Sequence, residues 1–271
     1  MSKDDSSVWL CERRTVAKIS YTESHKYAGK GAEYEQYYQT QTWQRFLWSR
    51  EQEIILKILE KYFADRDVHL LDFACGTGRV TALLENRVKT STGVDVSGSM
   101  LAIAREKLKR TQIIEADITV QNLLKPRTFN LITAFRFFLN AEPELRSVTL
   151  RALVEVLDKD GFFVFNNHQN LGCPWTKLLY AHHRRKNPEG TFNVMSIREM
   201  EELVHRAGLE IIELYPVGFF HPPKIPVSYR LNRAIDNVAG RFTFLHRFSE
   251  SPIAVCRHRR NHSSNGSALG K

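Results

Sequence analysis

The chain has 271 residues, of which 42% are hydrophobic and 25% charged, a composition that excludes wholesale disorder and a fibrous repeat. Lys and Arg number 39 against 30 Asp and Glu, so the formal net charge is +9. The excess is uneven, because residues 1–168 carry 24 basic and 22 acidic side chains whereas residues 169–271 carry 15 and 8. Acidic partners such as nucleic acid, anionic lipid or a small anion are therefore expected to meet the last third of the chain.

Cysteine spacing and hydropathy indicate in which cellular compartment the protein is expected. Cys11, Cys75, Cys173 and Cys256 are widely scattered and form no CxxC pair. The first residues are polar, and no run approaches the roughly 18 apolar residues of a membrane-spanning helix. We expect a cytoplasmic protein with free thiols and no transmembrane segment.

The first part of the chain predicts a helical cover. Residues 1–20 have no regular pattern, and residues 21–66 are rich in aromatic side chains. Apolar residues recur at three- and four-residue steps over 44–63, which indicates an amphipathic helix. This segment either closes over a bound ligand as a lid, with Tyr27, Tyr34, Tyr37 and Tyr38 facing it, or covers a sheet.

The middle third alternates between short apolar runs and helical patterns. The apolar runs predict strands over 69–74, 92–96, 113–116, 129–135 and 162–165, and the helical patterns cover 80–86, 99–110 and 144–157. Strands without polar alternation are covered on both faces, so we expect a parallel sheet between helical layers.

The last third has weaker signals. Ser196 and Glu199 form a predicted capping box that opens a helix ending at Arg206. Strands are expected over 209–215 and 252–257, a proline-rich crossover over 221–226, and a disordered tail over 261–271. The predicted organisation is an N-terminal extension and helical lid over 1–66, one α/β domain over 67–260 with insertions at 169–195 and 219–250 on the substrate side, and the tail.

The strongest local signal is the loop that follows the first strand. The run Asp72-Phe73-Ala74-Cys75-Gly76-Thr77-Gly78 leads from a buried strand into a helix. Glycines there allow close approach of a ligand, and the helix N-terminus favours electronegative groups. Asp95 ends the second strand, where a carboxylate can accept hydrogen bonds from a ribose diol.

Three features narrow the choice of nucleotide cofactor. The third glycine of a dinucleotide-binding loop is replaced by Thr81, and the Gly-Lys-Ser/Thr of a phosphate-binding loop is absent. Asp72 would repel phosphate but suits a cationic ligand with a free amino group. These features favour S-adenosyl-L-methionine (SAM) over NAD or ATP.

The segments DFACGTG, GVDVSGSML, IIEADI and FNLITAFRFF follow one another as the motifs of class I SAM-dependent methyltransferases do, and residues 68–168 resemble that family. The resemblance implies a Rossmann-like α/β fold with a seven-stranded, mostly parallel sheet between helices and an antiparallel last strand. It also implies cofactor-binding roles for Asp72, Ala74, Gly76 and Gly78 around the methionine portion, Asp95 on the ribose, Val96 and Met100 beside the adenine, Asp117 and Ile118 at its amino group, and Ala134 or Phe135 facing the methionine portion. The family often has glycine where Ala74 stands.

Two residues at the same sheet edge are candidates for acceptor chemistry. Arg136 follows the fourth strand and could pair with a phosphate or carboxylate of the acceptor, or with an acidic neighbour such as Glu142. His168 ends the fifth strand and could remove a proton from a hydroxyl acceptor, or simply donate a structural hydrogen bond.

Motifs of particular methyltransferase subclasses are missing, which excludes some classes of methyl acceptor. The Asn/Asp-Pro-Pro-Tyr/Phe loop of enzymes that methylate base amines is absent, and Arg136 stands where catechol-type enzymes place Mg²⁺ ligands. We therefore predict metal-free, in-line methyl transfer to a small-molecule, glycan or lipid-linked acceptor, at oxygen and with anionic character. Peripheral membrane contact remains open. The alternatives are a cofactor-binding regulatory subunit without catalysis and an RNA-modifying enzyme, the latter disfavoured because no RNA-binding module is recognisable.

Overall fold

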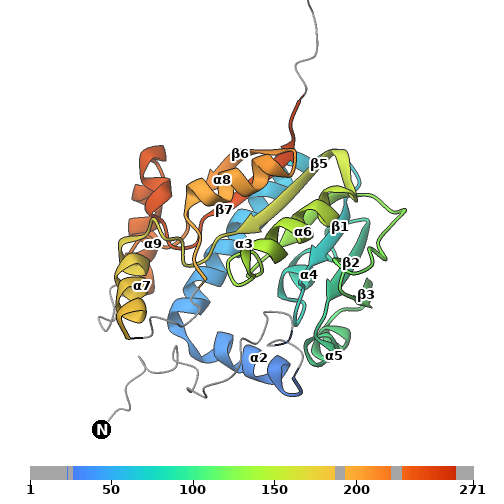
Figure 1. Ribbon diagram of the computed structural model, residues 1–271, viewed down its shortest axis with the longest axis horizontal. Coiled ribbons are helices and arrows are strands. Elements are labelled where there is room, and N and C mark those ends of the chain that lie inside the picture. Colours follow the sequence, from blue (N-terminus) through green and yellow to red (C-terminus); the bar gives the residue numbers. More distant parts are fainter. Residues whose placement is uncertain (1–22, 24–26, 187–192, 221–227, 261–271) are drawn as a thin grey trace, which may run out of the picture.

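The computed structural model describes residues 23, 27–186, 193–220 and 228–260 (Figure 1). The predictions for residues 1–20, for the proline-rich crossover over 221–226 and for the 261–271 tail lie outside the described residues. Within the described part, Cys75, Cys173 and Cys256 are buried free thiols.

A seven-stranded sheet forms the centre of the molecule, in the order β3-β2-β1-β4-β5-β7-β6 (Figure 1). The strands are β1 (His69–Phe73), β2 (Thr90–Asp95), β3 (Thr111–Glu115), β4 (Phe129–Ala134), β5 (Leu157–Asn166), β6 (Leu209–Tyr215) and β7 (Ile253–His258). β1 to β5 pair in parallel, and β7 runs antiparallel to both β5 and β6. The predicted mostly parallel sheet with an antiparallel last strand is confirmed.

Neighbouring residues of the central strands enter two different cores. Leu71 and Ile132 pack into one hydrophobic cluster, whereas Leu70 and Leu131, one position earlier, pack into the other. Because successive side chains of a strand point to opposite faces, a strand buried on both sides places apolar residues at consecutive positions. This explains the continuous apolar runs in the sequence.

Helices cover both faces of the sheet. They are α2 (Lys30–Thr40), α3 (Thr42–Phe63), α4 (Arg79–Leu84), α5 (Gly98–Lys107), α6 (Pro143–Val154), α7 (Pro174–Lys186), α8 (Ile197–Arg206) and α9 (Tyr229–Ala239), with the 3₁₀ helix η2 (Thr243–Phe248). α6 and α8 supply the helical side of one cluster, and α3 and α4 supply that of the other. α7, α9 and η2 lie together at one end of the molecule (Figure 1).

The predicted strands are all present, and the Ser196–Glu199 capping box is formed in both directions. The sequence patterns did not indicate α7, α9 or η2, which lie in the two segments predicted as insertions. The strand order reverses between β1 and β4, so the loops after these strands diverge and leave a crevice at their carboxyl ends.

Candidate active site

A cavity occupies that crevice, and its wall comes from the ends of β1 and β2, from loops after β1, β2, β3 and β4 and from helices α2, α4, α5 and α6. Its lining residues are Tyr34, Asp72, Phe73, Ala74, Cys75, Gly76, Arg79, Val80, Asp95, Val96, Met100, Ala116, Asp117, Ile118, Thr119, Phe135, Arg136, Phe137, Asn140, Leu145 and Thr149. Most of the predicted cofactor residues are thus brought together; Gly78 and Ala134 are not in the lining, whereas Phe135 is.

Asp72 is a buried carboxylate at the end of β1. Its Oδ2 accepts from the Thr81 backbone N–H at 3.1 Å and the Thr81 hydroxyl at 2.5 Å, and its Oδ1 accepts from the Thr133 hydroxyl at 2.7 Å. Burial raises the pKa of Asp72 to about 6, although the bonds from Thr81 and Thr133 oppose the rise. The side chain therefore holds β1, β4 and the start of α4 together and places negative charge at the cavity.

The loop after β1 uses the left-handed backbone region three times. Ala74, Gly76 and Gly78 have φ values of 53°, 56° and 78°. Gly78 also packs closely on α5, since a Cβ there would lie 2.9 Å from Leu108 Cδ1. Gly78 thus shapes the loop and seats α4 on its neighbour, and its position away from the cavity wall has this structural reason.

Two further carboxylates follow β2 and β3. Asp95 accepts from the Gly76 N–H through Oδ2 at 2.8 Å and from the Ser97 N–H through Oδ1 at 2.9 Å. Each carboxylate oxygen has a second acceptor site, so both remain able to accept from a diol. Asp117 accepts from the N–H and hydroxyl of Thr119 through Oδ1 alone, which leaves Oδ2 available to an amino group.

These donor and acceptor positions fit SAM. The carboxylate after β2 suits ribose hydroxyls, the free oxygen of Asp117 suits the adenine amino group, and Val96, Met100 and Ile118 supply apolar wall for the purine. Asp72 supplies negative charge on the side of the glycine loop, where a sulfonium and an α-amino group would be stabilised.

Helix α2 lies against α5 and reaches the cavity. Gly31 permits the contact, because a Cβ at this position would lie 2.7 Å from the Ser99 carbonyl oxygen. Lys107 of α5 pairs with Glu35 of α2 at 2.7 Å, and Tyr34 is part of the cavity wall. The aromatic segment therefore borders the site. Opening and closing of this segment as a lid stays a prediction.

Arg79 was not singled out from the sequence, yet it is a prominent charge of the site. Its guanidinium carbon lies 3.5 Å from the Tyr38 ring centroid and 4.7 Å from that of Trp48, and its Nη2 donates to the Tyr34 hydroxyl at 3.2 Å. Its Nη1 is buried without a hydrogen-bond partner in the described residues. Aromatic rings of α2 and α3 thus hold a cation against the cavity with one donor left over.

Arg136, at the end of β4, is 8% exposed and has a φ of 66°. Its Nη2 lies 2.9 Å from Oε1 of Glu51 on α3, its Nη1 donates to Gln44 at 3.3 Å, and its Nε has no partner among the described residues. Burial alone would lower the pKa of Arg136, but Glu51 and nearby tyrosines hold it above its usual value. The acidic partner is therefore a residue of α3 that sequence reasoning did not identify.

His168 is a buried residue that follows β5. Its Nδ1 has no hydrogen-bond partner in the described residues, and the side chain is not among those lining the cavity. Burial, with the charges of Arg136 and Arg79, holds the pKa of His168 well below its ordinary value. The imidazole is consequently neutral at physiological pH. Across the described part of the chain, no group of three or more His, Cys, Asp or Glu residues is arranged to hold a metal ion.

Comparisons with known proteins agree with this site. Residues 70–161 match the family model described as a methyltransferase domain. A protein of Geobacillus sp. (strain WCH70) named as a methyltransferase, without a stated acceptor, is 32% identical over 123 residues, which are 43% of this chain and 49% of that protein. The malonyl-[acyl-carrier protein] O-methyltransferase of Priestia megaterium is 22% identical over 65% of each chain. The chain thus spans about half to two thirds of the length of these curated relatives.

A solved structure shares the fold. The SAM-dependent methyltransferase of Thermotoga maritima superposes with a TM-score of 0.61 at 17% identity, over 84% of this chain and 95% of that chain. Residues 70–161 therefore match a methyltransferase domain, and the sheet around them has the fold of this SAM-dependent methyltransferase.

Proposed function

We propose that the protein transfers the methyl group of SAM to an oxygen of an anionic acceptor, a small-molecule or lipid-linked carboxylate. The observation that carries this proposal is the presence of two arginines, Arg79 and Arg136, in the cavity wall, each with a buried N–H that has no partner in the described residues. Buried donors on a charged group are costly unless a ligand satisfies them.

Within the described residues, the two guanidiniums have one ion-pair partner between them. Glu51 is buried and pairs with Arg136 at 2.9 Å, whereas Arg79 forms no ion pair with a described carboxylate. An anionic ligand would satisfy the donors that these contacts leave over.

Each arginine has its own expected ligand. Arg79 follows the glycine loop directly and is expected to pair with the carboxylate of the methionine portion of SAM. Arg136 follows β4, the strand next to β1 in the sheet, and is expected to pair with the acceptor. When bound, SAM supplies an electrophilic methyl group on a sulfonium.

The side chains of the site would contribute chiefly by positioning. A carboxylate oxygen already carries the electron pair that attacks the methyl group, so no proton has to be removed. This agrees with the position of His168 outside the cavity lining, and makes Arg136 the group that would orient the acceptor. The relative from Priestia megaterium acts on a malonyl group, which ends in a carboxylate.

The first experiment separates the two arginines by calorimetry and kinetics. We expect Arg79→Met to weaken SAM binding by about tenfold, the loss of one charge-assisted hydrogen bond. We expect the double variant Glu51→Gln/Arg136→Met, in which neither charge is left alone, to keep SAM affinity but raise the acceptor KM about tenfold or more. The single variant Glu51→Gln keeps Arg136 and is the matched control.

The second experiment identifies the acceptor class. A panel of carboxylic acids would be compared with their amides, with release of S-adenosylhomocysteine as the readout. Turnover of acids and not amides supports the proposal; turnover confined to amines or RNA would contradict it, and absence of turnover with intact SAM binding would favour a regulatory subunit. His168→Gln should leave the rate on a carboxylate unchanged, whereas a hydroxyl acceptor would lose rate in this variant.

A further inference from the structure

Exposed apolar side chains are concentrated at one end of the molecule. Of the thirteen large hydrophobic residues that are exposed in the described part of the chain, nine lie between residues 178 and 248. Six of them, on α7, α9, η2 and the link between α9 and η2, are Leu178, Leu179, Leu231, Val238, Phe242 and Phe244. Together with the basic residues of the same elements they are called the α7–η2 surface below.

Helix α9 exposes apolar side chains and buries polar ones, the reverse of an ordinary surface helix. Its buried residues are Asn232 and Asp236, whereas Leu231 and Val238 are 52% and 57% exposed. A helix that packs on a protein core normally buries its apolar face and exposes its polar face. Here the apolar face is left to solvent.

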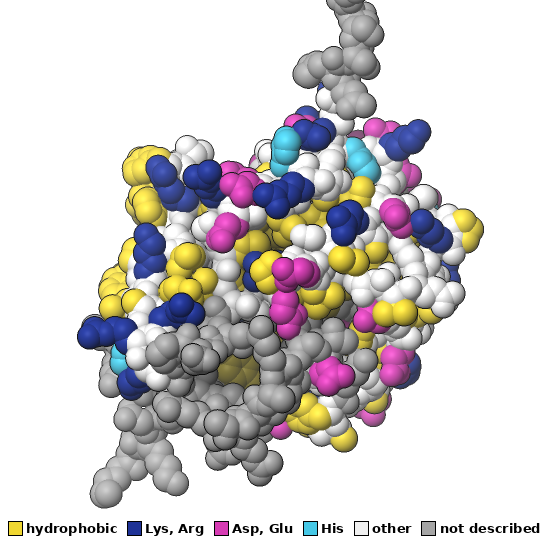
Figure 2. Space-filling model, in the orientation of Figure 1, with side chains coloured by type: hydrophobic (Ala, Val, Ile, Leu, Met, Phe, Trp, Pro, Cys, Tyr) yellow, Lys and Arg dark blue, Asp and Glu magenta, His cyan; other side chains and the backbone are white. Residues whose placement is uncertain are grey.

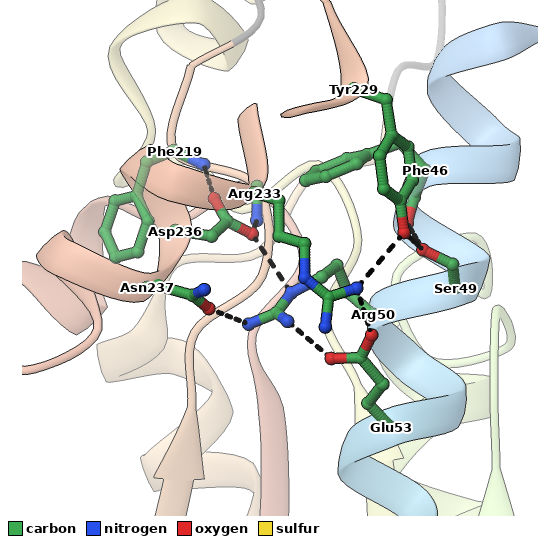
Figure 3. A network of polar contacts seen from close by, with 10 residues as sticks. Phe46, Ser49, Arg50, Glu53, Phe219, Tyr229, Arg233, Asp236 and Asn237 are labelled. Atoms are coloured by element: carbon green, nitrogen blue, oxygen red, sulfur yellow. Dashed lines mark hydrogen bonds and ion pairs between the residues drawn. The ribbon is translucent and has the colours of Figure 1, made fainter. Parts of the chain in front are cut away.

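Polar contacts hold α9 in this orientation against α3 (Figure 3). Arg233 pairs with Glu53 at 2.6 Å, and Arg50 lies 3.8 Å from Asp236 and donates to Asn237 at 3.1 Å. Asp236 also accepts from the backbone N–H groups of residues 218 and 219. The orientation of α9 is therefore fixed by these contacts, so the apolar face is a stable feature of the surface.

The start of α7 and the end of η2 are in contact, so the apolar side chains belong to one region. Asn170, just before α7, donates to the carbonyl oxygen of Arg247 at 2.8 Å, and a Cβ on Gly172 would lie 2.2 Å from the same oxygen. In Figure 1, α7 and α9 are both at the left of the molecule.

The same region is strongly basic. The sequence of α7 contains Lys177, Arg184, Arg185 and Lys186 and no acidic residue. Residues 229–248 contain four arginines and a single acidic residue, the buried Asp236. Dark blue and yellow side chains accordingly follow the left edge of the space-filling view (Figure 2).

We propose that the α7–η2 surface docks the protein on an anionic lipid bilayer. Exposed Phe and Leu side chains insert into the boundary between headgroups and acyl chains, and the surrounding Arg and Lys side chains pair with lipid phosphates. The long stems of Arg and Lys allow the charges to stay at headgroup level while the apolar residues go deeper.

Other occupants fit less well. Nucleic acid would use the charges and the rings of Phe242 and Phe244, but the four aliphatic side chains of the surface offer no ring on which a base could stack. A second copy of the chain in an isologous dimer would bring two sets of arginines together across the interface. A lipid surface uses both the apolar and the basic residues.

The test is flotation of the full chain with vesicles, compared between equimolar phosphatidylcholine and phosphatidylglycerol and pure phosphatidylcholine. We expect binding to the anionic vesicles, lowered about tenfold or more both in Phe242→Ser/Phe244→Ser and in Arg241→Glu/Arg247→Glu. Absence of binding to anionic vesicles, or binding that neither variant weakens, overturns the proposal.

Two controls sharpen the result. Val120→Ser/Leu123→Ser removes exposed apolar residues elsewhere in the described surface and should bind vesicles as the unaltered chain does. None of the substituted residues lines the cavity, so SAM affinity should be unchanged in every variant and reports that it is folded. Displacement of the protein from vesicles by RNA at equal phosphate concentration, or loss of a dimer in the phenylalanine variant, would contradict a lipid partner. Vesicle binding does not depend on methyl transfer, so failure of one proposal is distinguishable from failure of the other.

Discussion

Replacing Asp72 by asparagine should stabilise the fold at neutral pH while weakening cofactor binding. The side chain is buried, and burial raises the pKa of its carboxyl group from 3.8 to about 6. A carboxyl group whose pKa is higher in the folded chain opposes folding once it ionises, so this contribution grows as pH rises from 3.8 towards 6 and is constant above that range. The neutral amide of the Asp72→Asn variant would resemble the protonated carboxyl group and avoid the cost.

The size of the effect follows from the pKa shift. A rise of about two pKa units corresponds to about 3 kcal/mol at pH 7.5, which falls to about 1 kcal/mol by pH 4.5. We therefore expect the stability difference between Asp72→Asn and the unaltered chain to change by about 2 kcal/mol over this interval, in favour of the variant at the higher pH. A constant offset caused by the amide itself cancels in this comparison.

The assay is urea unfolding of both chains at pH 4.5 and 7.5, with SAM affinity measured by calorimetry at pH 7.5. Thr133→Val is the complementary variant, because it removes a 2.7 Å hydrogen bond to the same carboxylate and should destabilise the fold at pH 7.5. A stability difference for Asp72→Asn that is the same at both pH values would refute the reasoning, as would tighter SAM binding by this variant.

Three further predictions concern packing around the site. Glu51→Ala should lower the free energy of unfolding in urea by about 3–5 kcal/mol, because Arg136 is left buried and unpaired. The double variant Glu51→Leu/Arg136→Met should recover part of this loss. A loss below about 1 kcal/mol in Glu51→Ala would contradict a buried ion pair. Gly31→Ala should weaken SAM binding about tenfold, because the added Cβ displaces α2 from α5. Alanine favours helices, so the substitution should not unfold α2 itself. Unchanged SAM affinity would show that α2 does not border the cofactor. Gly78→Val should lower the free energy of unfolding by about 2–4 kcal/mol, because valine is strained at a positive φ and its side chain would clash with Leu108. An unchanged free energy of unfolding, measured by heat or urea, would argue against this loop geometry.

The sheet and the cofactor loop could be predicted because their signals are local. A strand buried on both faces needs consecutive apolar residues, such as Leu70 and Leu71 in β1. The turn after this strand needs residues that tolerate a positive φ. Asp95 and Asp117 could be located because parallel strands bring their carboxyl ends to one edge of the sheet. Fold and cofactor site therefore follow from short segments of sequence.

The acceptor side could not be predicted in the same way, because its contacts join distant segments. Glu51 meets residues 85 to 200 positions away, and nothing next to it in the sequence indicates a buried ion pair. Arg79 directly follows the glycine loop, but its importance depends on rings of α2 and α3. Helix α9 was missed although Leu231, Ile235 and Val238 recur at helical spacing. What the sequence does not show is that the polar face of this helix packs on α3.

The central claim is that this cavity holds SAM, and equilibrium dialysis of the unaltered, folded chain with labelled SAM tests it most directly. We predict one bound SAM per chain, displaced by S-adenosylhomocysteine and not by ATP or NAD. A folded chain that binds no SAM, or that releases it equally to ATP, would contradict the account.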